Sequence, residues 1–483
     1  MSRVIVFVFD GLQKELVTEE LMPNLKEFTS KGVRFLSHQP VFPTVTRVNS
    51  ATMVTGCFPA THGLMGNTAI VSEFSKTEPM NTYLKDHFVE LIDKGGDPLF
   101  VPTLAQSMAT LNLQYTAIGI GSTGQSFVHH PYLSDEKYGS TIHPEYSIPE
   151  RLNDEIISKF GPWPEASRPN TSRIERMIDI CIDYALVEQQ ADVTFLWCSE
   201  PDGSQHGTPL GSDTVFESVK AADKGFGRLL SWIEDNDMQD EFDIIVTCDH
   251  GHSSAEKIIP INEMLLEANF APPGMPGGVT VADNGGALLF YIEGKDFETG
   301  QSLIQWLFSQ YWSGPLLVAD YLQEIPGVLP TSLVGLDGVR GPDIALSFAW
   351  NENANLNGVK GFSYVASGRE GCGQHGSMNP TELRTFTVAN GPDFLKDVSI
   401  SSVSGHPDIA PTIMHLLGHT PPSYMEGEIL YEALSGQKEP KSGRIENISY
   451  SSQNEIVSDQ YSQQLIISPR ENGGYIVSAE YSH

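Results

Sequence analysis

Short apolar runs alternate with amphipathic segments along most of the chain. Residues 4–9 (VIVFVF) are β-branched or aromatic throughout and stop at Asp10, a pattern that indicates a strand buried on both faces of a parallel sheet. Residues 22–32 show helical spacing instead, with a proline near the start and a glycine at the end. Further strand-like runs occupy residues 115–120, 192–198, 242–248, 287–292, 343–349 and 384–389, mostly with helix-like segments between them. This alternation predicts an α/β fold with an open, mostly parallel central sheet, helices on both faces, and ligands at the carboxyl ends of the strands.

Two segments differ in composition from this predicted core. Residues 255–370 are rich in Gly and Pro and carry their own strand and helix signals, which indicates an inserted α/β lobe over a cleft. From about residue 431 the chain becomes rich in Ser and Gln, and residues 463–482 predict two strands joined by an Asn-Gly hairpin. We therefore expect one large α/β domain over residues 1–430 that contains the lobe, followed by a β-rich extension over residues 431–483.

The chain is strongly acidic. Among its 483 residues, 61 Asp and Glu stand against 29 Lys and Arg, so the formal net charge is -32. Such a surface repels polyanions, so we expect no long nucleic acid as a partner, whereas a small anionic substrate still binds where cations in a pocket reverse the field. The five cysteines lack CxxC pairing, as expected of reduced thiols. Because no apolar stretch approaches the ~20 residues of a membrane helix and the first apolar run is too short for a signal segment, we expect a soluble, cytoplasmic protein without a membrane partner. The sequence leaves the oligomeric state open.

Carboxylates and imidazoles follow several of the predicted strands, where an α/β sheet presents side chains to a ligand. A single Asp-Gly pair after a strand is usually only a turn. A carboxylate and an imidazole four residues apart, as in EPDGSQHG, are close enough to share one cation, although such a pair alone is more often part of a solvated loop. Several such loops, each next to Gly, are harder to attribute to chance. The candidate ligands are Asp10, Asp202, His206, Asp249, His250 and His375.

These side chains favour a site for two metal ions. Imidazole and carboxylate groups suit Zn²⁺, and Mn²⁺ or Fe bind by the same chemistry. Together with Thr46, the candidates are too many for one tetrahedral ion but suit two ions that share an open face. We therefore expect two divalent metal ions, with Zn²⁺ favoured. His252 lies beside the candidates in the sequence; it either supports a ligand from the outer shell or makes an ordinary loop hydrogen bond.

The stretch FPTVTRVNSATMVTG places Thr46 and Asn49 where a turn leads into a predicted helix. On propensity alone, Thr46 would be an N-cap. The metal candidates change this balance, because a hydroxyl at a helix N-terminus that is coordinated to a divalent ion loses its proton readily and becomes a nucleophile. Asn49, one turn later, can then donate its amide to a non-bridging oxygen of a phosphate, which helix N-termini favour. We therefore predict Thr46 and Asn49 as catalytic residues.

The motifs VFVFDG, FPTVTRVNSATMVTGCFPATHG, EPDGSQHG, VTCDHGH, GQHG and HPDIAPTIMHLLG resemble, in this order, those of the alkaline phosphatase superfamily. The type I phosphodiesterase and nucleotide pyrophosphatase branch is the most similar, and phosphonoacetate hydrolase is a near relative. The resemblance covers about residues 3–430 and implies an alkaline-phosphatase-like fold for that domain. It also implies that Asp202, His206 and His375 hold one metal ion, and that Asp10, Asp249, His250 and the Thr46 oxygen hold the other.

The resemblance further implies a two-metal hydrolase that cleaves phosphodiester or nucleotide pyrophosphate bonds of a small phosphorylated substrate through a phospho-threonine intermediate. A sulfatase is disfavoured, because the aligned nucleophile is Thr46 and no Cys-x-Pro-x-Arg motif stands there. Residues 119–127 (GIGSTGQSF) contain no Lys or Arg to bind a carboxylate or the extra charge of a monoester, which favours a diester or a pyrophosphate.

Several alternatives stay open. Arg47 either binds substrate or is solvated or paired with a carboxylate, and Asn67 either lines the site or takes a left-handed turn. A phosphonate or phosphomonoester hydrolase, or a phosphosugar mutase, would use the same metal core. A metal-binding protein without turnover is disfavoured, because both the nucleophile and the ligand set are intact.

Overall fold

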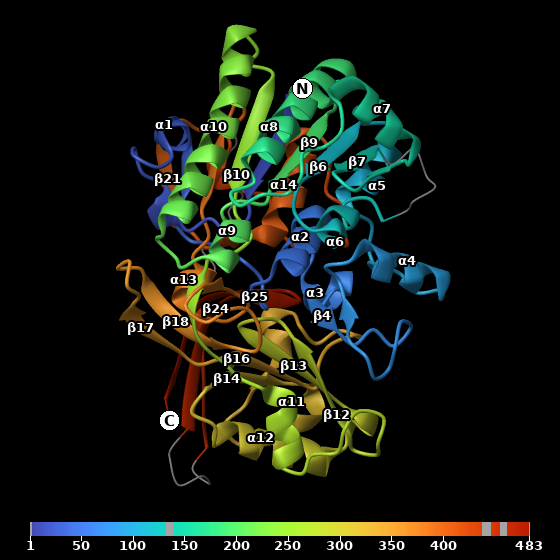
Figure 1. Ribbon diagram of the computed structural model, residues 1–483, viewed down its shortest axis with the longest axis vertical. Helices are drawn as coiled ribbons and strands as arrows, with labels where there is room; N and C mark the ends of the chain where they lie inside the picture. Colours follow the sequence, from blue (N-terminus) through green and yellow to red (C-terminus); the bar gives the residue numbers. More distant parts are fainter. Residues whose placement is uncertain (1, 132–138, 437–445, 455–460, 483) are drawn as a thin grey trace.

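The computed structural model describes residues 2–131, 139–436, 446–454 and 461–482. The molecule consists of two stacked parts, an upper part around a nine-stranded sheet and a lower lobe built from smaller sheets (Figure 1). The N-terminus lies in the upper part and the C-terminus beside the lower lobe. The predicted site residues come from both parts, so the junction between them determines where a site can form.

The nine-stranded sheet has the strand order β21-β2-β20-β10-β1-β9-β6-β7-β8. Its centre is parallel, because β1 (Arg3–Phe9) pairs with β9 (Val193–Cys198) and β10 (Phe242–Thr247), and β6 (Tyr115–Gly119) pairs with β9 and β7 (Ser140–His143). Antiparallel pairs flank this centre through β8 (Tyr146–Ile148) and β20 (Thr387–Asn390), and β2 (Val33–Phe35) and β21 (Val398–Ile400) complete one edge. The predicted α/β fold with a mostly parallel sheet is confirmed.

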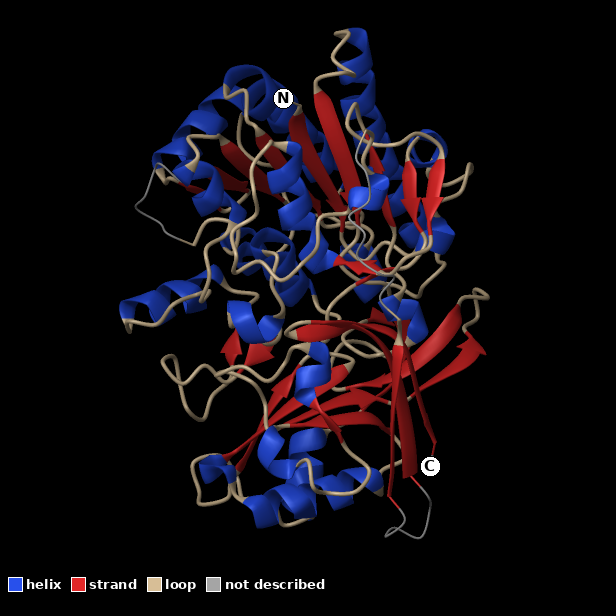
Figure 2. Ribbon diagram, turned by 180° about the vertical axis from the view of Figure 1, so that it is seen from behind, coloured by secondary structure: helices blue, strands red, loops and turns tan. Residues whose placement is uncertain are grey.

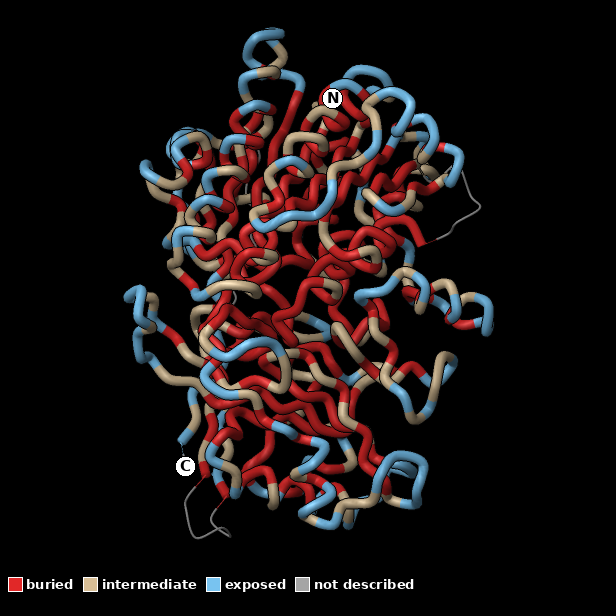
Figure 3. Tube along the Cα trace, in the orientation of Figure 1, coloured by how far each residue is buried: buried red, intermediate tan, exposed pale blue. Residues whose placement is uncertain are grey.

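Helices cover both faces of this sheet, because successive side chains of its central strand point to opposite sides. The Phe7 ring packs on one face against Phe226, at a centroid distance of 5.2 Å. Val6 packs on the other face, in a cluster with Met53. The first face carries α1 (Pro23–Lys31), α7 (Arg151–Phe160), α8 (Thr171–Ile180) and α10 (Asp213–Asp235), and the second carries α2 (Thr46–Thr55), α5 (Leu104–Thr110) and α14 (Ile409–Leu416). The central strands are therefore buried on both sides (Figure 3), as the unbroken apolar run of β1 predicts.

The lower lobe is built around a five-stranded sheet of order β12-β13-β16-β14-β15. The runs 287–292 and 343–349 form strands of this sheet and not of the central one, so their assignment to a single parallel sheet is wrong. Most pairs here are antiparallel, as short connections such as residues 284–286 require. The strands are β12 (Val279–Asp283), β13 (Ala287–Ile292), β14 (Ser313–Val318), β15 (Leu329–Pro330) and β16 (Ile344–Phe348), and α11 (Ile261–Glu267) and α12 (Phe297–Phe308) pack on one face.

The chain leaves the central sheet at the end of β10, builds the lobe, and returns to the sheet through β20. Because it leaves and returns at the same end, β20 runs antiparallel to β10, with Thr247 opposite Thr387. A four-stranded sheet lies on this route and consists of β17 (Trp350–Ala354), β18 (Lys360–Val365), β11 (Ser253–Ile258) and β19 (Gly373–Gln374). This route delivers residues of the lobe to the carboxyl end of the central sheet.

The C-terminal segment forms a three-stranded sheet beside the lobe (Figure 2), made of β23 (Ile448–Asn454), β24 (Tyr461–Arg470) and β25 (Gly473–Ser482). The predicted hairpin is confirmed, but its two-residue loop is Glu471-Asn472 and not Asn-Gly, because β24 and β25 pair up to their facing ends. Apolar side chains of both strands pack on the second face of the five-stranded sheet. The extension thus completes the core of the lobe, while the bounds of the domains stay a prediction.

Smaller elements lie beside α2, namely α3 (Pro59–His62), β4 (Thr68–Ala69), β5 (Met80–Asn81), α4 (Lys85–Asp93) and α6 (Thr123–Phe127). All five cysteines are buried and none forms a disulfide. In the part of the chain that the structure describes, no helix combines the length and the apolar character needed to cross a membrane.

Candidate metal centre

The strands β1, β9 and β10 end level with one another, since Phe9 is opposite Cys198 and Val8 is opposite Thr247. The loops that follow therefore meet at one edge of the sheet, where α9 (Asp202–Gly207) begins. The lobe supplies one further loop, directly after β19. Together these loops bring all the predicted ligands to the junction of the two parts, namely Asp10, Asp202, His206, Asp249, His250 and His375.

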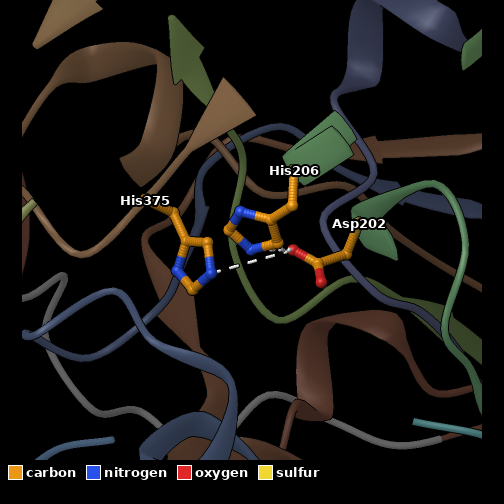
Figure 4. Close-up of side chains that lie close together, drawn as sticks. All are labelled: Asp202, His206 and His375. Carbon is orange, nitrogen blue, oxygen red and sulfur yellow. Dashed lines mark ion pairs between the residues drawn. The ribbon is translucent and has the colours of Figure 1, made fainter. Parts of the chain in front are cut away.

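The first group of ligands consists of Asp202, His206 and His375 (Figure 4). Oδ1 of Asp202 lies 3.1 Å from Nε2 of His206 and 3.7 Å from Nε2 of His375. The opposite ring nitrogens face backbone carbonyls, with Nδ1 of His206 3.2 Å from the Gly373 oxygen and Nδ1 of His375 2.8 Å from the Thr44 oxygen. A proton on each Nδ1 satisfies these carbonyls and leaves each Nε2 lone pair free to bind a cation.

The second group consists of Asp10, Asp249 and His250. One oxygen of each carboxylate is held by the protein, since Trp197 Nε1 donates to Asp10 Oδ2 at 2.8 Å and the Gly11 amide donates to Asp249 Oδ1 at 3.0 Å. The other oxygens, Asp10 Oδ1 and Asp249 Oδ2, are buried and accept no hydrogen bond from any described residue. They lie 3.6 and 3.2 Å from Nε2 of His250. Buried carboxylate oxygens without a partner are costly, so this group fits a bound cation.

The charges of the cluster also favour a bound cation. Burial raises the pKa of Asp10 well above its usual value, and the negative charges of Asp249 and Asp202 raise it further. Burial opposes protonation of His250, but the charges of Asp249 and Asp202 and the hydrogen bonds to Asp249 and to the Gly251 carbonyl together raise the pKa of the imidazole. Converging carboxylates of this kind repel one another unless a cation lies between them. A divalent ion would supply that charge.

Thr46 is the first residue of α2, and it is almost fully buried. The N-cap is Val45, so Thr46 does not cap the helix, which excludes the simpler explanation of its presence. Its Oγ1 instead lies 3.2 Å from Nε2 of His250, beside the second ligand group. The structure therefore places the predicted nucleophile next to the predicted metal ligands.

Contrary to what the sequence had led us to expect, the side chain of Asn49 does not face a substrate oxygen. Its Nδ2 donates to the Val45 carbonyl at 3.0 Å, and its Oδ1 accepts from the Val41 amide at 2.9 Å and lies 2.7 Å from Nδ1 of His406. The side chain is fully buried. Because both ends of the amide are engaged within the protein, Asn49 braces the loop before α2 and does not face a substrate oxygen.

Arg47 and Asn67 lie next to the nucleophile. The Asn67 Oδ1 accepts a hydrogen bond from the Arg47 amide at 3.3 Å, and the Asn67 amino group takes no part in this bond. The Arg47 guanidinium lies over the Tyr83 ring, 5.4 Å from its centroid. Among the described residues Arg47 has no ion pair. Burial lowers the pKa of its guanidinium, and the charges of Asp10 and Asp202 offset part of this effect. Both side chains are therefore near Thr46, and their contact with substrate stays a prediction.

Sequence reasoning missed several residues that hold this site in place. Trp197, which anchors Asp10, stands within an apolar run and carries no signal of its own. Glu382 of α13 (Pro380–Leu383) is fully buried and accepts from the Ser253 hydroxyl and the Ser377 amide, both at 2.6 Å. These two partners follow His252 and His375 in the chain, so Glu382 ties together two of the loops that carry histidines. Only the folded chain reveals such long-range contacts.

The profile of the family described as type I phosphodiesterase / nucleotide pyrophosphatase matches residues 4–306, which is more than half of the 483-residue chain. The chain belongs to this family. The match includes most predicted ligands and the nucleophile, whereas His375 lies beyond it.

Curated relatives of this family member share limited identity with it. A bis(5'-adenosyl)-triphosphatase from Xenopus laevis is 25% identical over 272 residues, which cover 56% of this chain and 51% of the relative. The protein of the same name from Mus musculus is 22% identical over 434 residues, or 87% of this chain and 78% of the relative. A venom phosphodiesterase from Naja atra is 23% identical over 254 residues, or 52% of this chain and 26% of the relative. The chain thus spans about half, or less, of the length of several relatives that it matches.

Solved structures show that the fold is shared within the family. Murine ectonucleotide pyrophosphatase / phosphodiesterase 5 superposes with a TM-score of 0.61 at 17% identity, over 90% of this chain and 100% of the other. A second structure of that protein is of an inactive threonine-to-alanine variant in complex with AMP. The likeness covers 90% of the chain and therefore extends beyond the end of the profile match at residue 306.

Proposed function

We propose that the protein is a two-metal hydrolase that cleaves phosphodiester or nucleotide pyrophosphate bonds of small phosphorylated substrates. The observation that carries this proposal is the position of the Thr46 hydroxyl, 3.2 Å from His250 Nε2, in a cluster of convergent carboxylate and imidazole ligand atoms. Family membership supports it, since relatives are named phosphodiesterases, pyrophosphatases and a triphosphatase.

The donor atoms fit two divalent cations, of which Asp202, His206 and His375 would hold one, and Asp10, Asp249, His250 and Thr46 the other. Mixed carboxylate and imidazole donors favour Zn²⁺, and Mn²⁺ or Fe fit by the same chemistry. Ions bound there would act as Lewis acids that lower the pKa of the Thr46 hydroxyl and stabilise negative charge on the phosphoryl group.

The residues of the chain then have distinct tasks. The Thr46 hydroxyl gives its proton to solvent, and its oxygen forms a bond to phosphorus while the bond from phosphorus to the leaving oxygen breaks. A water molecule next breaks the phospho-threonine bond and returns a proton to the Thr46 oxygen, so the hydroxyl is regenerated. The backbone amides at the start of α2 stabilise negative charge on the phosphoryl oxygens during both steps.

Arg47 and Asn67 are the proposed substrate contacts. The guanidinium of Arg47 has no ion pair among the described residues, so it is available for an anionic group of the substrate. The hydrogen bond from the Arg47 amide involves only the Oδ1 atom of Asn67. The Asn67 amino group can therefore donate to a phosphoryl oxygen of the substrate. An inactive threonine-to-alanine variant of a structural relative binds AMP, which supports a nucleotide as the substrate of this chain as well.

Hydrolysis of bis-p-nitrophenyl phosphate and p-nitrophenyl phosphate by the metal-reconstituted protein tests this proposal. We expect preference for the diester, and a loss of at least about a thousandfold in kcat for Thr46→Ala, because the nucleophile is removed. Thr55→Ala, at the other end of α2, is the matched control, since its hydroxyl donates to the Ala51 carbonyl and accepts from the Cys57 amide, both at the end of the helix away from the ligands.

Preference for the monoester would contradict the diesterase assignment and favour a phosphomonoesterase, with Arg47 binding the extra charge. No turnover of either compound by a protein that binds two metals would favour a phosphonate hydrolase or a phosphosugar mutase. Full activity of Thr46→Ala would contradict the proposed nucleophile.

A further inference from the structure

The imidazole ring of His252 lies in a narrow space between two glycines. The residue is fully buried, two positions after His250. A Cβ added at Gly11 would come within 2.7 Å of its Nε2, and a Cβ added at Gly373 would come within 2.9 Å of its Nδ1. Two glycines from distant parts of the chain thus leave room for this ring. Gly11 also has a φ of +69°, a conformation in which any other residue would be strained.

The ring makes the closest contact of the Asp202 carboxylate. His252 Nε2 lies 2.9 Å from Asp202 Oδ1, closer than the Nε2 atoms of His206 and His375, at 3.1 and 3.7 Å. Among the described residues, no other side chain outside the predicted ligand set forms a hydrogen bond or an ion pair with this carboxylate. Trp197 and the Gly11 amide orient Asp10 and Asp249 in the second ligand group, and His252 stands in the same relation to Asp202.

The second ring nitrogen separates His252 from the predicted ligands. His206, His250 and His375 each direct Nδ1 at a backbone carbonyl, at 3.2, 3.0 and 2.8 Å, which assigns the proton to Nδ1. His252 Nδ1 is buried and has no hydrogen-bond partner among the residues that the structure describes. An acceptor without a partner costs less than a buried N–H without one, so the proton of a neutral His252 belongs on Nε2. That N–H points at Asp202.

We propose that His252 is a positioning residue for the metal site of Asp202, His206 and His375: its Nε2–H donates to Asp202 Oδ1 and fixes the orientation of the carboxylate. The inference rests on the proposed metal centre and adds a residue to it. A carboxylate without this donor would rotate, and the cation would lose part of its affinity, since outer-shell partners of metal ligands typically contribute about ten- to hundredfold.

Two amide variants test the proposal with nearly equal chemistry. In His252→Gln the side-chain amide reaches the position of Nε2, whereas in His252→Asn it reaches only the position of Nδ1. Metal content and affinity are measured by chelator competition with Zn²⁺ on the metal-free chain, and Co²⁺ absorption reports the ligands of each site. Thermal unfolding of the metal-free variants shows whether the fold is kept.

We expect the wild type to bind two ions, His252→Asn to bind one of them about ten- to hundredfold more weakly, and His252→Gln to restore most of that affinity with an unchanged Co²⁺ spectrum. Wild-type affinity at both sites of His252→Asn would overturn the proposal. So would a His252→Gln variant as weak as His252→Asn with an altered spectrum, because the imidazole would then be a metal ligand itself. A wild type that binds no metal would overturn the proposed function along with this inference, so the two failures are distinguishable.

Discussion

At the scale of single residues, the site depends on how each ligand is held as much as on the ligands themselves. Asp10 and Asp249 each give one oxygen to a protein donor and keep the other without a hydrogen-bond partner. The sequence predicted these ligands because each follows a strand, and strand ends meet at one edge of a parallel sheet. It did not predict that Trp197 donates to Asp10. A tryptophan in an apolar run is expected to be a core residue, and its hydrogen bond joins two different strands.

Trp197→Phe removes the donor to Asp10 and keeps most of the ring. We expect activity and the affinity for one metal to fall about tenfold to a hundredfold, because the carboxylate loses its anchor. Trp312→Phe is the matched control, since the Trp312 indole nitrogen is buried in the lobe and has no hydrogen-bond partner in the described part of the chain. Steady-state kinetics and metal titration of both variants measure the difference. Equal behaviour of the two variants would contradict the assigned role of Trp197.

At the scale of elements, α2 shows where sequence reasoning succeeded and where it failed. The helix begins at Thr46 as the pattern suggested, and its first hydroxyl faces the ligands. Asn49 was expected to face a substrate because it lies one turn later. In the structure its side chain forms hydrogen bonds with Val41, Val45 and His406 instead. Of these three residues only His406 is distant in the sequence, so a local sequence pattern could not predict that contact.

Asn49→Ala tests this correction. The substitution removes the hydrogen-bond partner of the Val41 amide and of His406 Nδ1, so we expect the free energy of unfolding to fall by about 1–3 kcal/mol. Denaturant unfolding measures that change, and kinetics on the surviving folded protein measures KM and kcat. A variant of unchanged stability whose kcat collapses would show that the amide faces the substrate after all.

At the scale of the whole molecule, the sequence predicted the central sheet and an inserted lobe, but not which sheet each strand of the lobe joins. Unbroken apolar runs identify buried parallel strands, but they do not say to which sheet a strand belongs. The runs 287–292 and 343–349 therefore looked like β1, although short connections place them in the antiparallel sheet of the lobe. The lobe still contributes to the centre, because its return path carries His375 to the end of the central sheet.

The net charge of -32 also acts on the whole molecule. It disfavours long nucleic acid as a substrate, while a cation-filled junction would attract a small phosphorylated one. The cytoplasmic location and the choice of Zn²⁺ stay predictions from the sequence.

The most direct test of the central claim is the stereochemical course of hydrolysis at a phosphorus-chiral phosphorothioate diester in isotopically labelled water. An attack by Thr46 followed by an attack by water consists of two in-line displacements, so the account predicts net retention of configuration at phosphorus. Net inversion would show that water attacks the substrate directly, and it would contradict Thr46 as the nucleophile of this metal centre.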